Sequence, residues 1–169
     1  LNATNFSTYF EFRITEPGGY TNVVDSSGLY GADGLVFVVQ SVSSDLGGAG
    51  GGLGYEGIAP SVGVEYDTWD NTGQFTDPSS NHIGIDTNGS VVSVDTVDVG
   101  DDTVRSECFD NGEVWYSWID YDGTTLEVRI SDDGVRPLDA VLEENVDIAG
   151  ILGVSDAYVG FTAGTGADW

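Results

Sequence analysis

The sequence predicts an all-β fold, a sandwich of two antiparallel sheets. Apolar and polar residues alternate in FEFRI (10–14) and LEVRI (126–130), and this period of two is typical of half-buried strands. The Asp-Gly pair at 122–123 predicts a hairpin turn. Twenty-five glycines, gathered in connections such as GGAGGGLG (47–54), fit a sandwich with long loops. We therefore expect one domain with minimal helix.

Each expected strand follows from its own stretch of sequence. LVFVVQSV (35–42) is apolar on both faces, as a central strand would be, and AYVGFTA (157–163) is a further strand. Only the region 139–153 suits a short helical turn, and we find no internal repeat and no linker. The expected strands cover roughly 7–15, 34–42, 61–68, 82–86, 91–95, 113–121, 125–131 and 157–163.

The charge of the chain restricts its partners. There are 29 acidic residues against four basic ones, all arginine, for a net charge of −25. Nucleic acid and anionic membrane surfaces would be repelled, whereas cations would be attracted. The alternative explanation for most of these acids is a solvated surface in a salty or calcium-rich medium. Cys108 is the one cysteine, so an internal disulfide is excluded, and no apolar run approaches the ~20 residues of a membrane span.

A polar cluster is expected in SVGVEYDTWDNTGQFTDPSSNHIGID (61–86). If 62–68 is a strand, Glu65 and Asp67 share one face, while His82 shares a face with Asp86 in the next strand. Two carboxylates on one face repel each other, and a cation between them would allow both to be buried. If the two strands pair, the loop 69–81 closes over their polar face.

That loop would deliver an amide oxygen and another carboxylate to the cluster. An imidazole with carboxylates suits a transition ion such as manganese, and carboxylates with an amide oxygen and a backbone carbonyl suit calcium. Asp67 and Asp77 are candidates to bridge both ions. The alternative for His82 is an ordinary hydrogen-bonded histidine. The candidate cluster contains Glu65, Asp67, Asn71, Asp77 and His82.

Two other functions remain open at this point. EYDTWD (65–70) weakly resembles the Glu-x-Asp-x-x-Glu motif of sandwich-fold glycoside hydrolases, in which Glu65 and Asp70 would be nucleophile and acid/base at ~5.5 Å. The last acid is one carbon shorter than that motif requires, and a hydrolase does not need the downstream Asn and DPSSNH segment. The other function is a structural spacer in which the metal only stabilises the fold.

Several segments together resemble the legume-type (L-type) lectins. VGVEYDTWDN followed by DPSSNHIGID is similar to the metal loop of that family, and FSTYFEFRI, ADGLVFVVQ, GGGLG and YVGFTAGTGA match further segments in the same order. The composition of the motifs looks most like bacterial members in surface adhesins. One extra residue separates Asn71 from Asp77. The resemblance implies a concanavalin-like jelly roll over residues 1–169 as a single domain, a fragment without the family's flanking strands.

The resemblance also implies roles for individual residues. It implies a cis peptide before Asp33 and hydrogen bonds from sugar hydroxyls to its carboxylate. Asn71 would bind calcium through its oxygen and sugar through its nitrogen, and Trp69 offers a flat face for a pyranose ring. The implied transition-metal ligands are Glu65, Asp67, Asp77 and His82. The implied calcium ligands are Asp67, Asn71, Asp77 and the carbonyl of Trp69. The implied sugar contacts are Asp33, Gly51 or Gly52 through a backbone amide, Trp69, Asn71, Ala167 and Asp168.

These roles imply a calcium-dependent carbohydrate-binding module and not an enzyme. Its cofactors would be Ca²⁺ and manganese or another transition metal, and its partners would be glycans. The expected location is secreted or on the cell surface, within an adhesin.

Overall fold

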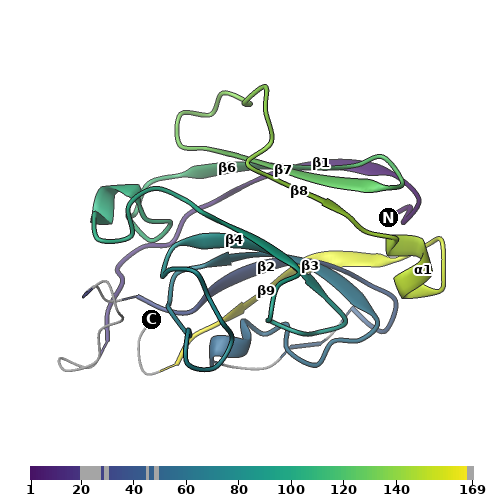
Figure 1. The fold of residues 1–169 in the computed structure, drawn as a ribbon, viewed down its shortest axis with the longest axis horizontal. Helices are drawn as coiled ribbons and strands as arrows, with labels where there is room; N and C mark the ends of the chain where they lie inside the picture. Colours follow the sequence, from purple (N-terminus) through teal and green to yellow (C-terminus); the bar gives the residue numbers. More distant parts are fainter. Residues whose placement is uncertain (20–27, 29–30, 45, 48–49, 167–169) are drawn as a thin grey trace.

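The fold consists of two antiparallel sheets packed face to face (Figure 1). The computed structural model describes residues 1–19, 28, 31–44, 46–47 and 50–166. One sheet has four strands in the order β1-β6-β7-β8, and the other has five in the order β5-β4-β3-β2-β9. This arrangement of two antiparallel sheets confirms the predicted fold class.

The elements of regular structure are mostly seven-residue strands. The strands are β1 (Phe6–Phe12), β2 (Gly34–Gln40), β3 (Ser61–Asp67), β4 (His82–Thr87), β5 (Asp95–Asp98), β6 (Trp115–Tyr121), β7 (Thr125–Ser131), β8 (Leu142–Asn145) and β9 (Tyr158–Gly164). The helical elements are two 3₁₀ turns, η1 (Gly50–Gly52) and η2 (Arg105–Glu107), and the short helix α1 (Ile148–Leu152). No helix in the described ranges is long and apolar enough to cross a membrane.

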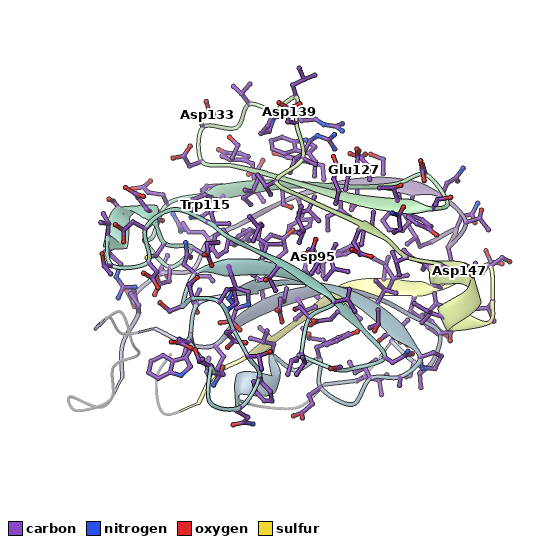
Figure 2. The ribbon with its side chains drawn as sticks, in the orientation of Figure 1. Asp95, Trp115, Glu127, Asp133, Asp139 and Asp147 are labelled. Atoms are coloured by element: carbon purple, nitrogen blue, oxygen red, sulfur yellow. The ribbon has the colours of Figure 1, made fainter. Side chains whose placement is uncertain are left out.

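The main core lies between the two sheets, where the side chains fill the space (Figure 2). Val64 and Tyr66 of β3 belong to the same buried cluster as Ile119 and Val128 of the opposite sheet. A smaller core lies on the other face of the five-stranded sheet and contains Val36, Val38, Leu53, Tyr55 and Val91. Because Leu53 and Tyr55 follow η1 directly, this second core holds the glycine-rich loop against the sheet.

Most of the expected strands are confirmed, and the hairpin at 122–123 is present between β6 and β7. Asp122 Oδ1 accepts hydrogen bonds of 2.8 Å from the backbone amides of Thr124 and Thr125, which fixes this turn. The helical turn expected within 139–153 is α1, where Asp147 accepts a hydrogen bond from Gly150 N and Gly153 ends the helix with a φ of 69°.

Two expectations about strands were wrong. The strand expected at 91–95 lies instead at Asp95–Asp98, where it pairs with β4. Val92 and Val94 alternate with polar residues in the first half of 91–99, and Val97 and Val99 do so in the second half, so periodicity could not select the half that pairs. The strand β8 was missed because LEEN has only one apolar residue in four, Leu142, which is buried.

Candidate functional site

The polar face of β3 and β4 forms the floor of the candidate site. The two strands pair as expected, with His82 opposite Asp67 and Gly84 opposite Glu65. His82 Nε2 lies 3.2 Å from Glu65 Oε1, and its Nδ1 lies 3.0 Å from the carbonyl oxygen of Ser79. Glu65, Asp67 and His82 are all buried. The lone histidine is therefore fixed on both ring nitrogens, beside a buried carboxylate.

Gly84 provides the space that Glu65 occupies. A Cβ atom at this position would overlap Glu65 Oε1 and Ser93 Oγ. A glycine opposite an acidic residue is therefore part of the site, although it contributes no ligand atom.

Replacing Gly84 by alanine is expected to destabilise the protein by about 1–3 kcal/mol, because Glu65 and Ser93 must move within a filled interior. Denaturant unfolding would measure the change. Gly160→Ala is the matched control, since this strand glycine has no heavy atom within 4 Å of the added methyl group. An equal loss in both variants would show that the glycine backbone, and not the space at Gly84, is responsible.

The loop after β3 brings the remaining candidates onto this floor. Asp67 Oδ1 accepts a 2.6 Å hydrogen bond from Trp69 N, and Asp77 Oδ2 accepts one of the same length from Asn71 N. Asn71 Oδ1 is buried and has no hydrogen-bond partner among the described residues. Trp69 is half-buried. The loop thus presents an amide oxygen to a region that already contains three carboxylates.

The carboxylates make hydrogen bonds to the protein in this arrangement. Within the described residues, no three His, Cys, Asp or Glu side chains are grouped so that they could hold a metal ion as they lie. Glu65 contacts His82 and Ser93, while Asp67 and Asp77 accept backbone amides. An ion bound here would therefore need some of these oxygens to exchange their present partners for the cation.

The protonation of these groups reflects their burial and their mutual repulsion. Burial, followed by the charge of Glu65, raises the pKa of Asp67 well above its usual value. Burial also raises the pKa of Asp77, although the Asn71 amide and His82 act against this. Burial alone would lower the pKa of His82, but Glu65, Asp77 and the Ser79 carbonyl outweigh it and raise that pKa. The site therefore concentrates more negative charge than a buried region tolerates without a cation.

Without bound metal, the free energy of unfolding is expected to fall as pH rises from about 4 to about 8. Unfolded aspartates lose their proton near pH ~3.9, while folded Asp67, Asp77 and Asp86 retain theirs to higher pH, so the folded state binds more protons. The raised pKa of His82 acts in the same direction, because its contribution is lost as pH rises through the folded value above 6.5. Exposed aspartates with lowered pKa, such as Asp101, act in the opposite direction only below pH ~4.

Urea unfolding of chelator-treated protein between about pH 4.5 and 7.5 checks this sign. A stability that increases throughout this range would contradict the prediction.

Two residues of the floor were not among the predicted site residues. Ser93 Oγ lies 2.6 Å from Glu65 Oε1 and 2.8 Å from Asp86 Oδ1. A hydroxyl has one proton, so it can donate to only one of them, and the other contact requires a protonated carboxyl. Burial and the charge of Glu65 raise the pKa of Asp86 well above its usual value, which favours the protonated form of Asp86. Strand alternation already placed Asp86 on the face of His82, but only the fold shows that Ser93 reaches them.

Asn81, the residue before His82, is held by hydrogen bonds of its side chain. Asn81 Oδ1 accepts a 2.9 Å hydrogen bond from Phe109 N, and Asn81 Nδ2 donates to the carbonyl of Glu107 at 3.1 Å. Cys108, between these two residues, is buried with its sulfur 3.6 Å from the Asp102 carbonyl oxygen. The segment 105–109 is thereby fastened to the start of β4.

A second part of the site lies where β2 begins. The Ala32-Asp33 peptide is cis, as the resemblance implied. Asp33 is buried, its amide donates to the Gly164 carbonyl at 2.9 Å, and its carbonyl accepts from Thr68 N at 3.0 Å. A Cβ atom at Gly166 would lie 3.6 Å from Asp33 Oδ2. The start of β2, the loop after β3 and the loop after β9 therefore meet at Asp33.

The glycine-rich loop completes this part of the site. Gly50 N donates to Thr165 O at 3.2 Å, and a Cβ atom at Gly51 would lie 3.3 Å from both side-chain atoms Oδ1 and Nδ2 of Asn71. The structure thus brings Gly51 next to Asn71, whereas a Cβ atom at Gly52 would contact the side chain of Glu56. Ala167 and Asp168, the other predicted sugar contacts, lie outside the described residues.

The paired-carboxylate alternative finds no support in this geometry. Glu65 is buried between His82 and Ser93. Asp70 accepts a 2.7 Å hydrogen bond from Thr72 N in the loop. The two carboxylates therefore serve different local structures.

The two packed antiparallel sheets, with polar loops meeting at the start of β2, define a lectin-type β-sandwich. A family model described as the legume lectin domain matches residues 1–169, and the chain belongs to this family.

Plant proteins are among its relatives. The chain is 37% identical over 169 residues to the L-type lectin-domain containing receptor kinase VIII.1 of Arabidopsis thaliana, covering 96% of this chain and 21% of that protein. It is 35% identical to Lectin-4 of Griffonia simplicifolia, covering 98% of this chain and 64% of that protein. The expected likeness to bacterial adhesins is not supported, because these relatives are plant lectins and receptor kinases.

Solved structures agree with this assignment. The lectin from Bauhinia forficata in complex with GalNAc has a TM-score of 0.71 and 28% identity, covering 99% of this chain and 69% of that chain. Lectin UEA-II complexed with galactose has a TM-score of 0.66 and 28% identity, covering 94% and 63%.

Proposed function

We propose that this chain is a calcium-dependent carbohydrate-binding domain that binds glycans without catalysis, in a secreted or cell-surface protein. The observation that carries the proposal is the meeting of four separate segments around Asp33 and Asn71. Asp33 supplies a carboxylate, and Gly51 supplies a backbone amide beside Asn71. The last loop approaches Asp33 closely at Gly166. These are acceptor and donor groups of the kind that adjacent sugar hydroxyls require.

The donor set fits calcium at the loop and a transition ion on the floor. Asn71 Oδ1 is a buried acceptor without a partner among the described residues, which is the kind of oxygen that calcium takes. Calcium would be held by Asp67, Asn71, Asp77 and the carbonyl of Trp69. Manganese or a similar ion would be held by Glu65, Asp67, Asp77 and His82, where an imidazole already lies beside a carboxylate.

In this proposal the metal supplies charge neutralisation, and the residues of the chain recognise the sugar. Asn71 presents its nitrogen to the sugar, Asp33 accepts hydrogen bonds from two hydroxyls, and an amide of the glycine-rich loop donates, from Gly51 rather than Gly52. Trp69 offers an apolar face to the ring. The structures of related lectins with galactose and with GalNAc support hexoses as the ligand class.

A glycan-array screen with and without calcium tests the proposed function. Binding to at least one class of hexose-containing glycan is expected in calcium, with loss of that signal in chelator and recovery on adding calcium back. Magnesium in place of calcium is the control, because it demands a more rigid octahedral site. Glycan binding of equal strength in chelator would refute the dependence on calcium.

A further inference from the structure

Three Asn-x-Ser/Thr sequences, or sequons, lie outside the candidate site. They are Asn2-Ala3-Thr4, Asn5-Phe6-Ser7 and Asn88-Gly89-Ser90. None has proline in the middle position, which would exclude attachment of an N-linked glycan. In all three the asparagine is exposed and lies outside the named strands. Exposure is the first requirement that such a bulky group imposes on a folded protein.

The sequon at Asn88 lies at the end of the sandwich opposite to Asp33. Asp33 directly precedes β2, whose first residue pairs with Asp67 at the end of β3. Asn88 instead lies where β3 begins, because its backbone amide donates a 2.8 Å hydrogen bond to the carbonyl of Ser61. β3 has seven residues, so its two ends are roughly 20 Å apart.

The N-terminal segment brings the other two sequons to the same end. Asn2 forms an isolated bridge with Asp156, and Ala3 N donates a 2.7 Å hydrogen bond to Ser155 O, just before β9 begins. The first residue of β9 pairs with the last residue of β2. Asn5 directly precedes β1, and Figure 1 shows the N-terminus beside α1. These two asparagines therefore lie at the end remote from the candidate sugar site.

A tight turn holds Asn88 at the surface. Ser90 N donates to Thr87 O at 3.1 Å, and φ is 55° at Asn88 and 69° at Gly89. Two consecutive positive φ angles define a type I′ turn, for which Asn-Gly is the preferred pair. A Cβ atom at Gly89 would lie 2.4 Å from Ile58 N, so this glycine is required. The turn accounts for Asn88 and Gly89, but it does not require the hydroxyl residue that completes the sequon.

The structure uses the two N-terminal sequons differently. Asn2 Oδ1 accepts hydrogen bonds from Thr4 N at 3.0 Å and from Thr4 Oγ1 at 2.8 Å, so a local turn accounts for both residues of that sequon. Within the part of the chain that the structure describes, the Asn5 side chain has no comparable hydrogen bond. Ser7 is exposed at the start of β1, with its hydroxyl 2.5 Å from Asp120 Oδ1. The sequon at Asn5 is therefore the one without a structural explanation for its asparagine.

Apolar side chains are exposed at this end of the sandwich. Val42, just after β2, is 48% exposed, and Val154, just before β9, is 43% exposed. Val92 is 47% exposed, and its amide donates a 3.1 Å hydrogen bond to Ser90 Oγ, so it adjoins the sequon at Asn88. A hydrated glycan is bulky and solubilising, and at this end it would shield apolar surface from other molecules.

We propose that Asn5 and Asn88 carry N-linked oligosaccharides, so that the end of the sandwich opposite Asp33 is a glycan-covered surface. The proposal rests on the secreted or cell-surface location proposed above, since the oligosaccharide is transferred on that route. In the transfer, the asparagine Nδ2 bonds to C1 of an oligosaccharide and loses one proton. The bond from C1 to the oxygen of a lipid diphosphate breaks, and the diphosphate leaves with the electron pair. The sugar-binding end remains uncovered.

The test expresses the protein behind a secretory leader peptide in eukaryotic cells, so the result does not depend on its natural location. Enzymatic release of an N-linked glycan leaves aspartate at the former attachment site. Peptide mass spectrometry after release is expected to identify Asn5 and Asn88 in this way. Asn5→Gln and Asn88→Gln should each remove the mass of one glycan, and the double variant should remove both.

Variants at the hydroxyl residues provide matched controls. Ser90→Ala should remove the glycan from Asn88 while the Asn-Gly turn remains, whereas Ser90→Thr keeps the sequon and should retain the glycan. Ser7→Ala and Ser7→Thr make the same comparison for Asn5. Melting curves establish that each variant is folded.

Removal of both glycans is expected to increase light scattering on heating by about twofold or more, because the exposed valines lose their cover. Wild-type protein without released glycan, or glycan that persists in Ser90→Ala and Ser7→Ala, would overturn the proposal. Sugar binding on the array is measured separately. Its absence from a glycosylated protein would count against the proposed function alone, and its presence in a protein without glycans would count against this inference alone.

Discussion

Asp33→Ala is expected to abolish sugar binding while calcium binding and the fold remain intact. In the proposed function, a single sugar site is expected to bind with a Kd on the order of 0.1–1 mM, or about −4 to −5.5 kcal/mol. Hydrogen bonds to a charged acceptor contribute about 1.5–3 kcal/mol each, so losing them moves the Kd beyond a measurable range. Titration calorimetry with the best sugar from the array would measure binding, and a calcium titration would measure the metal.

Two further variants sharpen this result. Asp33→Asn keeps the size of the side chain and removes the charged acceptor, so it should also lose sugar binding. Asp139→Ala removes one carboxylate from the exposed loop between β7 and β8 of the four-stranded sheet (Figure 2), whereas Asp33 directly precedes β2 of the other sheet, so this variant should bind normally. Undiminished binding by Asp33→Ala would place the sugar site elsewhere.

Removing calcium is expected to lower the melting temperature by roughly 5–11 °C. A ligand present at 100 times its Kd stabilises a protein by about 2.7 kcal/mol, and 1 kcal/mol shifts the midpoint of a domain this size by about 2–4 °C. Calorimetry in calcium and in chelator measures the shift. Asn71→Ala should reduce the shift because it removes a ligand oxygen, and Asp139→Ala should preserve it. An unchanged midpoint in chelator would contradict the metal assignment.

Acid should have opposite effects on the two forms. In calcium, lowering the pH is expected to destabilise the protein, because protons displace the cation from Asp67 and Asp77. In chelator, the raised pKa values of the same carboxylates make mild acid stabilising. A reversal of slope between the two conditions would therefore report the ion itself, independently of any sugar.

The sequence could predict the floor of the site because strand geometry is simple. A period of two places Glu65 and Asp67 on one face, and antiparallel pairing with the next strand brings His82 opposite Asp67. Asn71 and Asp77 could be predicted to lie near this floor, since they belong to the loop that joins the two paired strands. Alternation could not show that Ser93 bridges Glu65 and Asp86, because that contact depends on an irregular segment before β5.

Other parts of the site depended on the resemblance or on the fold itself. The cis peptide before Asp33 has no local signal in Ala-Asp-Gly, and only the family likeness implied it. Gly51 and Gly52 were equivalent in the sequence, and the packing of the loop separated them by placing Asn71 beside one and Glu56 beside the other. The position of β5 was not predicted because both halves of 91–99 contain a short alternating stretch, and only the second half pairs with β4.

The buried thiol of Cys108 gives the molecule an internal reporter. It is the single cysteine of the chain, and it lies in the segment 105–109. Asn81, which directly precedes His82, fastens this segment to the start of β4. A thiol reagent can reach it only when this segment opens. The labelling rate therefore measures how often the floor of the candidate site loosens, under conditions where the rest of the protein remains folded.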